Sequence, residues 1–191
     1  MKQVLLAALT FALMSSAGAA LHEGDAAPDF TAAASLAGKE FSFSLHEALK
    51  TGPVVVYFYP SAYTGGCNIQ AHTFAVNYDK FAAVKASVIG VSLDNIARLN
   101  DFSADPDYCA GKVPVASDAN GDIALAYQLS IRDAVAGRKD TRGVEIGHGF
   151  AERTTFIVAP DGKIAATIGG LAPEKNVEAA LEKVRAIAGQ K

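Results

Sequence analysis

A run of five apolar, β-branched and aromatic residues, Val54–Phe58, most constrains how this chain can fold. Such a run is typical of a central strand in a parallel sheet, because both faces of that strand are covered. A second buried strand is expected over 87–93, and apolar positions at helical spacing predict a helix over 67–85 between the two. Strand, helix and strand in this order indicate a βαβ unit at the centre of an α/β domain.

Further elements are predicted on both sides of this unit. In chain order they are a strand (40–45), a helical turn (46–50), a helix capped near Asp94, a short strand (112–116), a turn (117–122), a helix (123–129), a hairpin (154–158 with 163–168) and a final helix (173–188). Residues 130–152 are polar and Gly-rich, which favours a long irregular loop. This order predicts a thioredoxin-like fold: a central mixed β-sheet flanked by helices, with extra N-terminal strands.

The first 20 residues have the layout of a secretory signal peptide. Lys2 precedes an apolar run over 4–14, and Ala17-Gly18-Ala19 provides a small-residue cleavage site. The apolar run is shorter than the roughly 20 residues that a membrane-spanning helix needs. We therefore expect cleavage near Ala19-Ala20, a single domain over 21–191, and a periplasmic or secreted protein with no membrane segment in its mature form. An uncleaved N-terminal anchor is the alternative.

Composition narrows the possible partners and cofactors. The formal net charge is −3 and no basic run is present, which argues against nucleic acid as a partner. The four histidines are isolated from one another, and no Cys/His cluster has the spacing of a metal site. We expect neither a metal nor another cofactor.

Cys67 stands out because it follows the central strand at the predicted start of a helix. Free N–H groups and the positive end of the helix dipole would face its thiol there, and this favours the nucleophilic thiolate. The second cysteine of the chain is Cys109. In an exported protein, two cysteines suggest a disulfide, which could be structural or part of a reaction cycle.

Two motifs resemble those of the peroxiredoxins (AhpC/TSA superfamily). Pro60-x-x-x-Thr64-x-x-Cys67 after an apolar strand is similar to their active-site signature, and Arg153-Thr154-Thr155-Phe156-Ile157-Val158 resembles a later strand with its arginine. The resemblance covers nearly the whole mature chain. It implies a thioredoxin-dependent peroxidase that reduces hydrogen peroxide and organic hydroperoxides.

The resemblance also implies a role for each residue of these motifs. Cys67 would be the nucleophile, and Thr64 would both donate to and accept from the peroxide. Arg153 would stabilise the thiolate and the transition state, and Pro60 would shield the sulfur from water. The backbone N–H groups of Gly66 and Cys67 are further candidate donors.

The position of Cys109 indicates which branch of the peroxiredoxins the chain resembles. Cys67-Asn68-Ile69-Gln70-Ala71-His72 resembles the peroxiredoxin Q (bacterioferritin comigratory protein) branch, with Gln70 where other peroxiredoxins often have Glu. Some members have a resolving cysteine five residues after the first, where this chain has His72. Others carry it on the helix before a short strand, which is the pattern that Cys109 matches. The resemblance therefore implies an intramolecular Cys67–Cys109 disulfide, a thioredoxin-like reductant and a monomer.

Other functions are compatible with the same fold. A thioredoxin-like thiol–disulfide oxidoreductase would need Cys-x-x-Cys, whereas this chain has Thr64-x-x-Cys67. A glutathione-peroxidase-like enzyme is less favoured because the chain contains no Trp. A non-enzymatic binding domain with a structural Cys67–Cys109 bridge is the remaining alternative.

Overall fold

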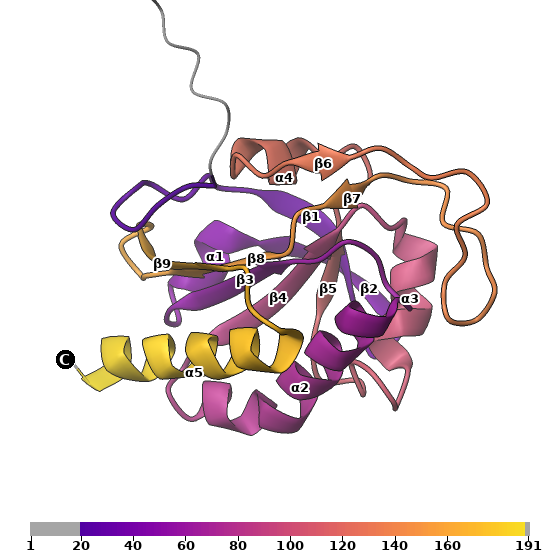
Figure 1. Ribbon diagram of the computed structural model, residues 1–191. Helices are drawn as coiled ribbons and strands as arrows, with labels where there is room; N and C mark the ends of the chain where they lie inside the picture. Colours follow the sequence, from indigo (N-terminus) through magenta and orange to yellow (C-terminus); the bar gives the residue numbers. More distant parts are fainter. Residues whose placement is uncertain (1–19, 190–191) are drawn as a thin grey trace, which may run out of the picture.

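The structure is a computed structural model that describes residues 20–189. Its centre is a seven-stranded mixed sheet in the order β2-β1-β5-β4-β3-β8-β9, flanked by helices on both faces (Figure 1). The strands of the sheet are β1 (Thr31–Leu36), β2 (Lys39–Ser44), β3 (Val54–Phe58), β4 (Ser87–Ser92), β5 (Val115–Ser117), β8 (Thr154–Val158) and β9 (Ile164–Gly169). This arrangement confirms the predicted fold class.

The central strand β3 is buried on both faces, as its apolar run predicts. It pairs in parallel with β4 and antiparallel with β8. Val55 and Tyr57 contribute to the core under α2 (Gly65–Ala82), α3 (Ile96–Ala104) and α5 (Pro173–Gly189). The alternate residues of β3 point to a second core, which α1 (Leu45–Leu49) and α4 (Asp122–Ala126) cover. The carboxyl end of β3 therefore leads into α2 from the middle of a rigid sheet.

The N-terminal strands form a hairpin at one edge of the sheet. β1 pairs with β2 along its whole length and with β5 on its other side, both antiparallel. Only the second of these strands was predicted as an element. Thr31–Leu36 contains three alanines, which have low β-propensity, so its strand conformation depends on pairing with its two neighbours.

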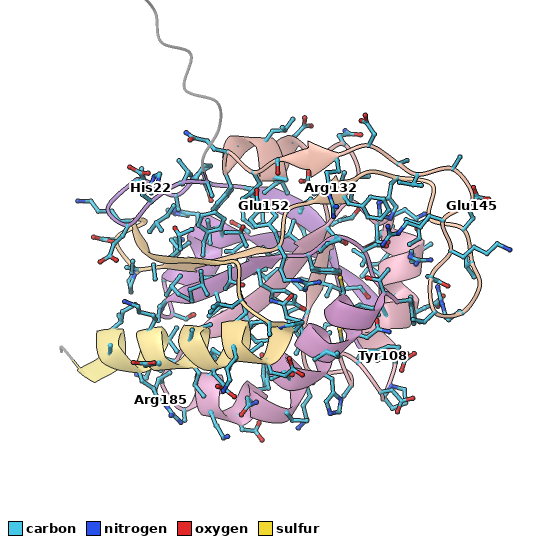
Figure 2. All side chains as sticks on the ribbon, in the orientation of Figure 1. His22, Tyr108, Arg132, Glu145, Glu152 and Arg185 are labelled. Carbon is cyan, nitrogen blue, oxygen red and sulfur yellow. The ribbon has the colours of Figure 1, made fainter. Side chains whose placement is uncertain are left out.

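Residues 130–152 are only partly the irregular loop that the sequence predicts. They include a small two-stranded sheet, β6 (Ile131–Arg132) with β7 (Phe150–Ala151), and a bridge between Lys139 and Glu145. Arg132 and Glu145 lie on this segment, on the side of the molecule away from Arg185 of α5 (Figure 2). We call residues 130–152 the excursion.

The described residues do not test the predicted N-terminal signal, because residues 1–19 lie outside them. Within 20–189, no helix is both long and apolar enough to cross a membrane. In that same part of the chain, no group of three or more His, Cys, Asp or Glu side chains is placed to hold a metal ion.

Candidate active site

The loop between β3 and α2, residues 59–64, is held in place by the buried carboxylate of Asp94. This carboxylate accepts hydrogen bonds from the Ala62 N–H at 2.7 Å and from the Ser61 hydroxyl at 2.9 Å. His148 and Arg98 approach the same carboxylate, with Nε2 and Nε each 2.8 Å from Oδ1. A fully buried carboxylate is tolerated when it is paired and hydrogen-bonded in this way. Asp94 therefore fixes the backbone that leads to Cys67.

The helix cap predicted near Asp94 is confirmed, and it lies at the next residue. Asn95 is the N-cap of α3, and its side-chain oxygen accepts from the Arg98 N–H at 2.9 Å. Asp94 is instead drawn inward by the donors around it, and its role as an anchor of the active-site loop was not foreseen.

The excursion docks on the same loop from outside. The Tyr63 carbonyl accepts from both the N–H and the hydroxyl of Thr141, at 2.8 and 2.9 Å. The Arg142 guanidinium lies 3.3 Å from the centre of the Tyr63 ring, and Asp140 pairs with both Arg142 and Arg98. Tyr63 has a φ of +58°, an unusual conformation for a bulky residue. The contacts from the excursion hold this strained position.

The His148–Asp94 pair predicts a dependence of stability on pH. Burial opposes protonation of His148, but the hydrogen bond and charge of Asp94 outweigh it, so the pKa of His148 is raised. Its stabilising contribution is therefore complete below the unfolded pKa of about 6.5, and it is lost as pH rises through the higher folded pKa. His148→Gln should flatten the fall in the free energy of unfolding as pH rises above about 6.5, measured by urea unfolding. The exposed His46→Gln is the control, and an unchanged slope in His148→Gln would contradict this assignment.

Cys67 lies in the first turn of α2 and is buried, with 2% of its surface exposed. Thr64 is the N-cap residue by its backbone, yet its side chain does not cap the helix. Its hydroxyl donates instead to the Ser61 carbonyl at 2.8 Å. The Thr64 proton is thereby committed, so the hydroxyl oxygen is left as an acceptor. While this bond is made, the hydroxyl cannot also donate to the peroxide as predicted, and its role as an acceptor stays a prediction.

Arg153 brings a permanent cation to the sulfur. It precedes β8, and its Nη2 lies 3.2 Å from Cys67 Sγ, while Nη1 donates to the side-chain oxygen of Gln70. Gly66 makes room for this approach, since a Cβ at that position would lie 3.2 Å from Nη2. Cys67 and Arg153, which are 86 positions apart in the numbering, thus meet in the structure.

The other predicted contributors to the site differ in outcome. The Cys67 N–H donates to the Thr64 carbonyl at 2.9 Å, so its predicted role as a free donor is wrong. The Gly66 N–H has no backbone acceptor among residues 20–189, and it remains a candidate donor. Pro60 is half-buried in the loop after β3, and its shielding role stays a prediction.

Cys109 is buried and free, as is Cys67. The prediction that it lies on a helix is wrong: α3 ends at Ala104, and Cys109 lies in the turns that follow. Pro106 explains this, because the residue before a proline is disfavoured in helical conformation and Asp105 is extended. Burial, with a smaller effect from Asp105, raises the pKa of the Cys109 thiol well above its ordinary value.

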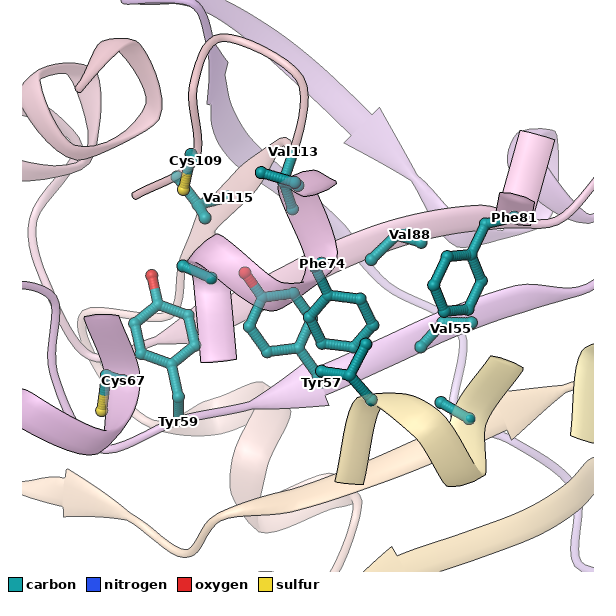
Figure 3. Packing of buried hydrophobic residues seen from close by; sticks show 14 of the residues in the cluster. Val55, Tyr57, Tyr59, Cys67, Phe74, Phe81, Val88, Cys109, Val113 and Val115 are labelled. Atoms are coloured by element: carbon teal, nitrogen blue, oxygen red, sulfur yellow. The ribbon is translucent and has the colours of Figure 1, made fainter. Parts of the chain in front are cut away.

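The two cysteines belong to the same apolar core but are not bonded to each other. Figure 3 shows the ring of Tyr59 between the part of the core that holds Cys67 and the part that holds Cys109. The Cys109 turn is tied to α2, because His72 Nδ1 lies 3.0 Å from the Asp107 carbonyl oxygen. A movement of this turn away from α2 would break this contact.

Comparison with known proteins identifies the family. The sequence pattern of the AhpC/TSA family matches residues 23–167, and YkuU of Bacillus subtilis, a protein assigned to the peroxiredoxins, is 32% identical over 147 residues, covering 74% of each chain. The chain is a peroxiredoxin of the AhpC/TSA family. A crystal structure of peroxidoxin BcpB from Mycobacterium tuberculosis is 28% identical, covers 87% of this chain and 98% of its own, and superposes with a TM-score of 0.72. Peroxiredoxin Q of rice chloroplasts is 44% identical over 82 residues, which are 43% of this chain and 36% of the rice protein.

As a peroxiredoxin, the chain is an enzyme, a thiol-dependent peroxidase. The comparisons do not favour the alternatives of a thiol–disulfide oxidoreductase or a binding domain. Of the residues that surround the site, sequence reasoning missed Asp94, His148 and Asn176. Each is a single polar residue in a loop or helix, and no local pattern separates it from a surface residue.

Proposed function

We propose that Cys67 is the peroxide-attacking residue of this peroxiredoxin. The observation that carries the proposal is the Arg153 Nη2–Cys67 Sγ contact of 3.2 Å at the start of α2. A guanidinium and a helix N-terminus both favour a negative sulfur, and the buried position keeps bulk water away from it. Within 20–189, Arg153 makes no ion pair with a carboxylate, so its charge is available to the sulfur.

The first chemical step forms an S–O bond and breaks the O–O bond of the peroxide. The Cys67 thiolate is oxidised to sulfenic acid, and the peroxide is reduced to water or an alcohol, whose oxygen takes up a proton. Thr64 Oγ1, with its own proton donated to Ser61, accepts the hydroxyl proton of the bound peroxide. Arg153 and the Gly66 N–H stabilise the charge that moves onto the leaving oxygen. Pro60 limits the access of water.

Cys109 completes the cycle in this proposal. Its thiol loses a proton and the thiolate attacks the Cys67 sulfur; the S–S bond forms, the S–O bond breaks, and the leaving hydroxide takes up a proton to become water. Because the Cys109 pKa is raised by burial, the turn after α3 and the first turn of α2 must open before this step. A thioredoxin-like dithiol protein then reduces the disulfide. Hydrogen peroxide and organic hydroperoxides are the substrates.

Trapping of the sulfenic acid with a dimedone probe tests both cysteine roles. We expect no label in Cys67→Ser and persistent label in Cys109→Ser, because the second variant forms the sulfenic acid but cannot resolve it. Peroxide-treated wild type should lose its label with time and yield a Cys67–Cys109 peptide on mapping. Absence of that peptide would instead favour a one-cysteine enzyme that depends on an outside thiol.

Export and a monomeric state are further parts of the proposal. The layout of residues 1–20 supports cleavage near Ala19-Ala20 and a periplasmic or secreted enzyme. Mass spectrometry of the full chain expressed in a bacterium would find the shortened protein outside the cytoplasm, and an uncleaved cytoplasmic product would contradict export. An intramolecular disulfide needs no second subunit, which supports a monomer. Light scattering of the reduced and oxidised protein measures the oligomeric state.

A further inference from the structure

Asn176, near the start of α5, is buried with 1% of its surface exposed and makes three side-chain hydrogen bonds. Its Nδ2 donates to the Ile168 carbonyl at 3.1 Å. Its Oδ1 accepts from Gln70 Nε2 at 3.0 Å and from the Thr155 hydroxyl at 2.7 Å. Gln70 Oε1 in turn accepts from Arg153. A continuous path of hydrogen bonds therefore runs from β9 through two side-chain amides to the guanidinium at Cys67.

The direction of every bond in this path is fixed by its two ends. The Ile168 carbonyl can only accept, so it requires the NH₂ group of Asn176 and turns the Asn176 oxygen toward Gln70. Gln70 must then present its own NH₂ group to that oxygen, which leaves its carbonyl oxygen facing Arg153. The guanidinium can only donate, so the path closes without two donors or two acceptors in contact.

We propose that Asn176 is a positioning residue for Arg153, which acts by setting the amide orientation of Gln70. Gln70 and the Cys67 sulfur are the side-chain acceptors of Arg153. Gln70 is completely buried, so its amide has no water to replace a lost partner. The orientation of the guanidinium therefore depends on α5, whose sequence lies more than 100 positions beyond Cys67.

The same path explains why position 70 carries an amide. A glutamate there would offer Arg153 an oxygen, but its second oxygen would face Asn176 Oδ1, placing two acceptors in contact. Asn176 could relieve this contact only by turning its own oxygen toward the Ile168 carbonyl. Asn176 thus selects Gln over Glu at position 70, and the two residues should be energetically coupled.

The inference rests on the proposed role of Cys67, so its test measures Cys67 directly as well as peroxide turnover. The rate of Cys67 alkylation by iodoacetamide, followed by site-resolved mass spectrometry across pH, reports thiolate formation without peroxide. Asn176→Leu should move the pH midpoint of alkylation upward and lower kcat/KM for hydrogen peroxide about 10-fold to 100-fold, as misplaced catalytic groups do. KM for the reductant should not change, because the buried Asn176 side chain is not available to contact a reductant protein.

Ser103→Ala is the matched control, because Ser103 is fully buried and hydrogen-bonded to Ser35 and to the Gly38 N–H. It should lower stability without moving the alkylation midpoint. If Asn176→Leu does not fold, Asn176→Ser is the second variant, since it keeps a hydroxyl for the Ile168 carbonyl but is too short to reach Gln70. An unchanged midpoint and an unchanged peroxide rate in the folded variant would overturn the proposal.

A double-mutant cycle tests the polarity of the path. Gln70→Glu should slow the reaction with peroxide. The factor by which it slows the reaction should be at least about threefold smaller in the Asn176→Leu background, where residue 176 offers no oxygen to oppose the second carboxylate oxygen. A coupling of this size is in the range found between contacting residues. If Gln70→Glu slowed the peroxide reaction by the same factor in wild type and in the Asn176 variant, the proposal that Asn176 selects Gln at position 70 would be overturned. A wrong assignment of Cys67 has a different signature: Cys67→Ser would still react with peroxide, whatever residue 176 is.

Discussion

Cys67→Ser is expected to abolish peroxide reduction, with kcat/KM lowered by about 10⁴-fold or more, as for the loss of other catalytic nucleophiles. A serine hydroxyl stays protonated near neutral pH, and even the cation at 3.2 Å does not convert it to a comparable nucleophile. Stopped-flow mixing of reduced protein with hydrogen peroxide measures the effect. The thiol count should remain unchanged on the time scale in which wild type loses the Cys67 thiol.

Cys109→Ser is the control for this experiment. It should retain the first, stoichiometric reaction with peroxide and lose only repeated turnover with a dithiol reductant, because the buried Cys109 acts after the sulfenic acid has formed. If Cys109→Ser instead lost the first reaction and Cys67→Ser kept it, the two roles would have to be exchanged.

Arg153→Met is expected to lower kcat/KM for peroxide by about 10²-fold to 10³-fold, the usual cost of removing a preorganised donor from a developing charge. Methionine fills a similar volume but offers neither charge nor N–H groups to Cys67 and Gln70. Arg153→Lys should recover only part of the loss, since one ammonium cannot reproduce the two-nitrogen contact with both partners. Single-turnover kinetics across pH separates loss of thiolate from loss of transition-state stabilisation.

Arg132→Met is the matched control. Arg132 is exposed on β6, and its replacement removes the same charge from the molecule. It should leave the peroxide rate within about twofold, since solvent and salt screen the charge of an exposed side chain. Equal losses in the two variants would mean that net charge matters and that the contact with Cys67 does not.

Local sequence patterns predict the central sheet, because strands that are covered on both faces must consist of apolar residues. The apolar run Val54–Phe58 could only be a strand covered on both faces, and the turn around Pro160-Asp161-Gly162 joins β8 to β9 as an antiparallel pair. The β1 strand was not recognised because its alanines have no strand preference of their own. Pro106 is the local signal that Cys109 lies outside the helix, because the residue before a proline disfavours helical conformation.

The site residues that could be predicted from the sequence are those that belong to a recognisable motif. Thr64 and Cys67 are one helical turn apart, and Arg153 heads a recognisable strand, so their convergence follows from the fold. Asp94 and Asn176 have no such pattern. Their hydrogen bonds to the active-site loop and to Gln70 join segments 32 and 106 positions apart, and only the tertiary structure brings those segments together.

The contact between His72 and the Asp107 carbonyl connects events at the two sulfurs. His72 lies on α2 five residues after Cys67, and Asp107 lies two residues before Cys109. Unwinding of α2 that reached His72 would therefore free the turn that buries Cys109 in the same motion. In the proposed cycle, this turn would keep the Cys109 thiol buried while Cys67 is reduced, and unwinding of α2 would release it. The enzyme would thus cross one barrier to expose both sulfurs instead of two in succession.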